Sequence, residues 1–171
     1  MRRSGRARRP GLSLARIGRT ERGAAIAAAV LFLPALLAVM AALFSLGQVV
    51  WYRHIAYQAA DLGALAGVQA LDLDQLAQGK LHLLTGEATA RASEYAWENI
   101  VLALGPLPPG LDVQVHVINP AGADASDPIT GRVIEYPTVC VVLRFPVNLR
   151  VGPVQWTQDI NAHADASVVP R

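Results

Sequence analysis

Charged and chemically reactive side chains are scarce in this chain of 171 residues. Asp, Glu, Lys and Arg make up 16% of it, 53% is hydrophobic, and there is one cysteine, Cys140. A single cysteine cannot form an internal disulfide, and the apolar strand around Cys140 predicts a buried small side chain rather than a reactive thiol. The composition excludes a disordered chain, which has fewer apolar residues, and a coiled coil, which has more charge.

Patterns typical of catalysis or metal binding are also missing. The four histidines are scattered without metal-ligand spacing: His54, His82, His116 and His163. We interpret His163, Asp159 and Asp165 as the polar face of a strand, and His116 as a surface residue, because they alternate with apolar residues. No serine lies in a nucleophile elbow, and no glycine-rich phosphate loop follows a strand. We therefore expect no enzyme activity, cofactor, metal or small-molecule substrate.

The charge that is present is unevenly distributed. Residues 1–22 contain eight arginines and one acid, a formal charge of +7, whereas residues 23–171 carry −5. The arginines have no interleaved aromatic residues and directly precede an apolar run. We interpret them as membrane-topology signals with lipid contacts, not as a nucleic-acid site, and those nearest the run are Arg16, Arg19 and Arg22.

Residues 23–52 contain no formal charge. Their most apolar part, 24–47, would form a helix about 36 Å long, enough to cross a hydrocarbon core of about 30 Å. Pro34 is tolerated in such a span. Because the basic tail precedes the span and only Arg53 directly follows it, we expect the N-terminus in the cytoplasm and the remainder outside. Three aromatic residues stand where an interfacial anchor would lie: Trp51, Tyr52 and Tyr57.

Two alternatives to an uncleaved anchor are a buried soluble helix and a cleaved signal peptide. Ser45-Leu46-Gly47 has the small-x-small form that signal peptidase reads. The apolar run is longer than the 7–15 residues typical of a signal core, however, and a soluble helix seldom lacks polar residues for so long. The sequence favours the anchor.

The helix is expected to continue beyond the span. Ala59, Gly63, Gly67 and Leu71 are four residues apart, so they share one helix face on which small side chains allow close approach. Because glycine costs about 1 kcal/mol in a helix interior, two on one face indicate a packing requirement. The partner of this face is either the sheet or a helix of another subunit; the alternative is an ordinary alanine-rich helix without a special partner.

Residues 21–71 resemble the TadE/TadG-like family, whose members are minor pilin-like or assembly components of Flp/Tad pili. The resemblance rests on an arginine-glycine pair before the span, a proline within it, a glycine near its end and an alanine-rich stretch after it: Glu21-Arg22-Gly23, Pro34, Gly47, Tyr52-Arg53 and Gln58–Gly67. Prepilins cleaved after the glycine carry a glutamate five residues later, where this chain has Ala28. The resemblance therefore implies the uncleaved, TadG-like branch.

The remainder of the chain predicts one helix and a small sheet. A helix is expected from Thr85, as its cap, to about Leu104, with Tyr95 and Trp97 in the core. Alternation predicts a strand over 111–117 and a last strand over 160–168. Between them we expect a long loop over 119–131 and a strand over 139–143, bounded by Pro137 and Pro146.

These expectations give an α+β fold: one N-terminal transmembrane helix that continues into a long helix, followed by a small antiparallel sheet domain. The helix is pilin-like by resemblance. We divide the chain into an arginine-rich tail (1–22), a transmembrane helix (23–52) and an exported domain (53–171). The resemblance implies a single-pass protein of the bacterial cytoplasmic membrane that contacts pilus or secretion subunits and the lipid bilayer. The alternatives are a membrane-tethered ligand-binding or sensory domain unrelated to pili, and a secreted hydrolase, which lacks an evident nucleophile and base.

Overall fold

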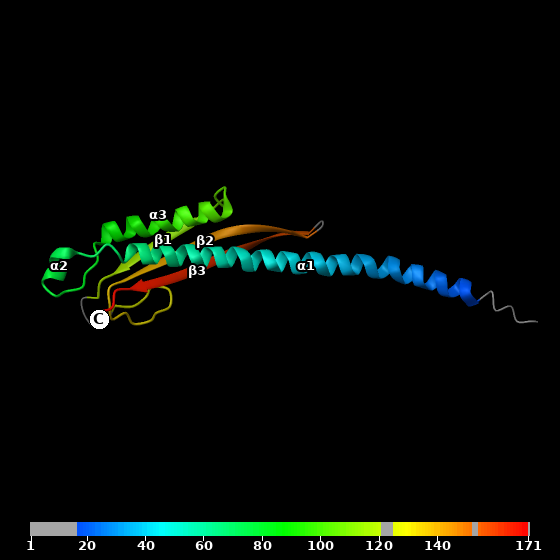
Figure 1. Cartoon of the computed structure of the whole chain (residues 1–171), viewed down its shortest axis with the longest axis horizontal. Coiled ribbons are helices and arrows are strands. Elements are labelled where there is room, and N and C mark those ends of the chain that lie inside the picture. Colours follow the sequence, from blue (N-terminus) through cyan, green and yellow to red (C-terminus); the bar gives the residue numbers. More distant parts are fainter. Residues whose placement is uncertain (1–16, 121–124, 152–153, 171) are drawn as a thin grey trace, which may run out of the picture. The chain divides into compact units, whose positions relative to one another are not determined.

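The computed structural model describes residues 17–120, 125–151 and 154–170 (Figure 1). Within them the chain forms three helices and then three strands: α1 (Ile17–Gly67), α2 (Leu73–Ala77), α3 (Thr85–Leu104), β1 (Asp112–Ile118), β2 (Thr138–Val151) and β3 (Val154–Ser167). The chain divides into two compact units, Met1–Ala42 and Leu43–Arg171. A long apolar N-terminal helix followed by a small antiparallel sheet confirms the coarse α+β expectation.

Helix α1 has 51 residues and contains Pro34. Among the described residues, only its Gly23–Gly67 segment is long and apolar enough to cross a membrane by length and composition. Its most apolar stretch has no buried residue, and large side chains such as Phe32 and Leu31 are 74% exposed. Pro34 lies in this exposed stretch. The apolar side chains of this stretch are therefore exposed on the surface of the described residues.

The sheet has the strand order β1-β2-β3, and both neighbouring pairs are antiparallel. β1 confirms the first predicted strand. β2 was predicted to end before Pro146 but continues to Val151, and β3 begins six residues before the prediction. β1 pairs with β2 only as far as Arg144. Pro146 therefore lies where β2 has a described neighbour on one side only, and a residue without an N–H is tolerated there.

The core of the second unit lies between the helices and one face of the sheet. Buried residues come from the second half of α1, from every fourth residue of α3, and from the odd-numbered positions of β2: Ile55, Ala56, Ala59, Ala60, Ala64; Ala88, Ala92, Ala96, Ile100; Val139, Val141, Leu143, Phe145, Val147, Leu149. The helix contacts are made largely by alanine and glycine. Small side chains let the helix backbones approach each other closely, so larger strand residues fill the remaining volume.

Hydrogen bonds join the connection between α1 and α3 to the residue that follows β1. Leu83 is fully buried, and the side chain of Asn119 holds it on both sides. The Leu83 amide donates to Asn119 Oδ1 (2.8 Å), and Asn119 Nδ2 donates to the Leu83 carbonyl (2.9 Å). Asp72 starts the short helix α2 by accepting hydrogen bonds from the amides of Asp74 and Gln75. The bonds from Asn119 satisfy the backbone groups of the buried Leu83, which would otherwise be unpaired.

Candidate functional site

The predicted small-residue face lies inside the domain. Ala59, Gly63 and Gly67 are buried and Leu71 is partly buried. A Cβ at Gly63 would lie 2.8 Å from the Ala92 carbonyl oxygen of α3. A Cβ at Gly67 would lie 2.9 Å from a side-chain methyl of Val139 in β2. The sheet, one of the two partners considered from the sequence, contacts this face at Gly67. The chain's own helix α3, which was not considered, contacts it at both glycines.

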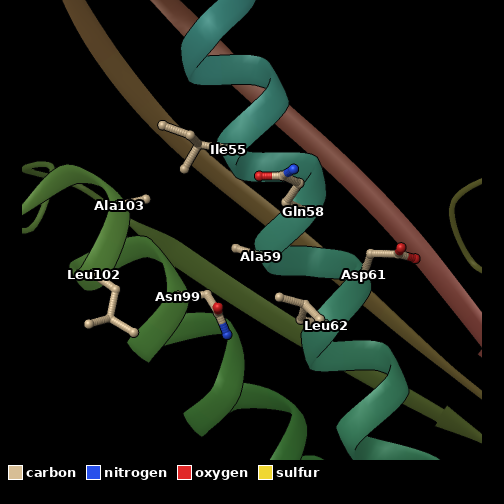
Figure 2. Close-up of a pocket in the computed structure, with 8 residues that line it drawn as sticks. All are labelled: Ile55, Gln58, Ala59, Asp61, Leu62, Asn99, Leu102 and Ala103. Atoms are coloured by element: carbon tan, nitrogen blue, oxygen red, sulfur yellow. The ribbon is translucent and has the colours of Figure 1, made fainter.

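A cleft of about 480 Å³ runs beside that face, between α1 and α3 (Figure 2). Five residues of α1 and three of α3 line it: Ile55, Gln58, Ala59, Asp61, Leu62; Asn99, Leu102, Ala103. The lining arises because the buried alanines bring the two helices together, while the longer side chains on either side of the contact point outward. The cleft is thus a consequence of the small-residue packing.

The cleft combines apolar side chains with amides. Leu102 is 82% exposed and Leu62 is 46% exposed, so both offer apolar surface to a partner. Asn99 donates from Nδ2 to the Tyr95 carbonyl (2.7 Å), which fixes its amide at the cleft. In Figure 2 the Asp61 carboxylate points away from α3. Exposed leucines beside a fixed amide suit contact with an apolar protein segment better than chemistry on a small molecule.

Two aromatic residues of α3 lie outside the core, contrary to expectation. Tyr95 is 49% exposed and Trp97 is 39% exposed. α3 buries the positions 88, 92, 96 and 100, which are four apart, so 95 and 97 flank the buried stripe. The predicted core assignment was wrong because the helix uses its small residues, not its large ones, for the close contact.

The structure describes only some of the residues that were assigned to the membrane surface. Arg16 lies outside the described residues, and Arg19 and Arg22 fall in the first turns of α1. Trp51 and Tyr57 are about half exposed. The rings of Trp51 and Tyr52 meet edge to face, with centroids 5.1 Å apart. These aromatic residues follow the exposed apolar stretch directly.

The face of the sheet opposite the helices carries polar residues. In the register, Cys140 of β2 stands between His116 of β1 and Asp165 of β3. Cys140 is fully buried, as predicted, and His116 is partly buried. Burial raises the pKa of the Cys140 thiol to about 12, and the negative charges of Asp127 and Asp165 act in the same direction. The thiol is therefore protonated at neutral pH.

The segment between β1 and β2 places Asp127 beside this face. Asp127 is 5% exposed; its Oδ1 accepts from the Ile129 amide (2.8 Å) and its Oδ2 from the Thr130 hydroxyl. Burial alone would raise the pKa of Asp127, but these hydrogen bonds and the nearby His163 hold it below its usual value. His163 Nε2 lies 3.5 Å from Asp127 Oδ2.

His163 was predicted on a polar face with Asp159 and Asp165. The alternation is confirmed, because Ile160, Ala162 and Ala166 are buried on the other face of β3. The structure also brings His163 to Asp127 and Cys140, while Asp159 is exposed at the partner position of Pro146. Asp165 lies 3.6 Å from Arg132 in an ion pair. Sequence reasoning missed Asp127 because it belongs to a loop with no periodic pattern, and it precedes Cys140 by 13 residues and His163 by 36.

Comparisons with protein-family models, with curated proteins and with solved structures found no match for this chain.

Proposed function

We propose that this chain is a single-pass envelope protein that acts as a TadE/TadG-like component of a bacterial Flp/Tad-type pilus or secretion assembly. The observation that carries the proposal is the continuity of α1. One helix begins as an exposed apolar stretch and ends packed in an α/β domain. The family resemblance implies the same architecture, in which one continuous helix forms the membrane anchor and then packs in the folded domain.

The topology of the proposal follows from charge. The arginine-rich tail lies in the cytoplasm, α1 crosses the cytoplasmic membrane, and the pilin-like domain lies outside. The aromatic pair Trp51–Tyr52 supports an interface at the end of the exposed stretch, since such rings favour the headgroup region. The chain works through protein–protein contacts, without catalysis and without nucleic acid.

The contact surface in this proposal is the α1–α3 cleft. Its occupant is an apolar helix of a neighbouring subunit, because the two lining helices present leucines that a helix with apolar residues at i and i+3 or i+4 would cover. Leu102 supports this assignment most strongly, since 82% exposure leaves almost the whole side chain without a partner. Asn99 and Gln58 lie at the same cleft and provide polar contacts around the leucines.

The test is complementation of a deletion strain in the host. Deletion should abolish surface pili, measured as sheared fibre protein and by electron microscopy, and the wild-type chain should restore them. Leu102→Asn should lower pilus yield at least about fivefold, because it removes an apolar anchor of the kind that costs more than about 1 kcal/mol.

Leu73→Asn is the matched control. Leu73 of α2 is 72% exposed and lies outside the cleft, so this variant should restore normal pili. Normal pili in the deletion strain would overturn the pilus function. Equal yields from the Leu102 and Leu73 variants would overturn the cleft as the contact surface.

A further inference from the structure

Three potential metal ligands meet on the face of the sheet that the helices do not cover. They are an Asp127 carboxylate oxygen, the Cys140 sulfur and a His163 ring nitrogen, and all three atoms lie within 4.8 Å of one another. They come from three places: the loop before β2, β2 itself and β3. The proposed pilus role uses none of them.

The nitrogen of His163 provides a second, independent observation. His163 Nε2 is buried from solvent and has no hydrogen-bond partner. Its closest acidic oxygen, Asp127 Oδ2, is 3.5 Å away and already accepts from the Thr130 hydroxyl. A buried polar atom without a partner is costly, and a cation bound between these groups would satisfy it.

The geometry fits a small tetrahedral cation. Zinc bonds of 2.0–2.3 Å to N, O and S place neighbouring ligand atoms about 3.3–3.8 Å apart. The separation of His163 Nε2 from Asp127 Oδ2, 3.5 Å, is already in this range. Because no two ligand atoms are more than 4.8 Å apart, they need to approach by at most about 1.5 Å, which a rotation of the side chains would supply.

The surroundings of the cluster favour a cation. Asp127 is held in place by the Ile129 amide and the Thr130 hydroxyl, as carboxylate ligands commonly are by an outer shell of hydrogen bonds. Asp165, the register partner of Cys140, adds a second negative charge, and Arg132 partly balances it. Thiolate, imidazole and carboxylate together are a zinc-type ligand set rather than a calcium or magnesium one.

We propose that Asp127, Cys140 and His163 bind a zinc-class divalent cation that ties the loop before β2 to strands β2 and β3. Binding requires the Cys140 thiol to lose its proton to solvent as the sulfur–metal bond forms. A water molecule supplies the fourth position of the tetrahedron. The proposed role of the metal is to hold the loop against the two strands, and the site stands independently of the pilus role.

The test is a cobalt titration of the full chain in detergent after a chelator has removed bound metal. Cobalt reports a thiolate ligand by a charge-transfer absorption band, and Cys140 is the only cysteine that can give it. We expect one Co²⁺ per chain, a thiolate band, visible bands typical of tetrahedral cobalt, and displacement of both by Zn²⁺.

Variants then assign the ligands. Cys140→Ala should abolish the thiolate band while preserving a small apolar side chain in the buried position. His163→Gln and Asp127→Asn should each weaken cobalt binding by at least the ~10–100-fold that follows loss of outer-shell partners. The control is His82→Gln, which removes a histidine that also lies beside an aspartate, Asp72, at 4.0 Å, and should leave binding unchanged. Circular dichroism identifies the variants that fold.

The wild-type titration decides the proposal even if a variant fails to fold. A wild-type chain that shows no thiolate band at saturating Co²⁺ overturns it. So does a band retained in folded Cys140→Ala, or an equal loss of affinity in the His82 and His163 variants.

Discussion

The two halves of α1 are both rich in alanine and leucine, but their surroundings are opposite. In the first half, large side chains such as Ile26 and Leu36 are about 60% exposed or more. In the second half, Ile55 is 7% exposed and Ala56, Ala60 and Ala64 are fully buried. The difference teaches that apolar composition alone does not specify what covers a helix. The first half exposes its large apolar side chains, whereas the second half carries Gly63 and Gly67 where α3 and the sheet approach.

The largest expected effect comes from placing a charge in the exposed half. Leu36→Arg near the middle of the apolar stretch should raise the free energy of membrane insertion by about 3 kcal/mol, which lowers the equilibrium constant for insertion about 100-fold. Membrane association after carbonate washing measures it. Leu65→Arg, an exposed leucine of the second half, is the control and should insert normally. Equal insertion of both variants would contradict a membrane role for the first half.

A substitution of the same residue type in each half gives the next effect. Ile55→Ala should lower the free energy of unfolding of the domain by about 2–3 kcal/mol, because it leaves a cavity in the core. Ile26→Ala, at a position 66% exposed, should change it by less than about 0.5 kcal/mol. Urea denaturation in detergent, followed by circular dichroism, compares them. A similar loss in both variants would show that the first half is also packed by protein.

The smallest effect tests the closeness of the α1–α3 contact. Gly63→Ala should destabilise the domain by about 1–2 kcal/mol, because a clash with the Ala92 carbonyl exceeds the gain of about 1 kcal/mol in helix propensity. Gly86→Ala in α3 has open space around its Cβ position and should be neutral or stabilising. If Gly63→Ala also stabilised the domain in the same denaturation assay, the result would contradict the close contact between Gly63 and Ala92.

The elements of the fold with strong periodicity could be predicted from the sequence. The helix over 85–104 was predicted with its bounds, although Thr85 is its first residue and Leu84 the cap. β2 was cut short at Pro146, since a sequence does not show that β1 ends before that proline. The five-residue helix α2 was missed; its start depends on the Asp72 side chain rather than on any periodic pattern.

The candidate sites could be predicted less well. Spacing placed Ala59, Gly63 and Gly67 on one face, but it could not tell an internal partner from another subunit. The cleft beside that face depends on which side chains of α3 point away from α1. Strand register and one loop bring together Asp127, Cys140 and His163. The spacing of residues along the sequence predicts neither the register nor the path of the loop.

The contact between Gly67 and Val139 has a consequence for the order in which the chain folds. Gly67 belongs to the first half of the sequence, and Val139 arrives 72 residues later with β2. Until β2 has been synthesised, α1 and α3 can pair but their alanine faces have no sheet to cover them. The nascent domain therefore passes through a stage with an incomplete core, when aggregation or capture by a chaperone competes with folding. Completion of the domain depends on the last third of the chain.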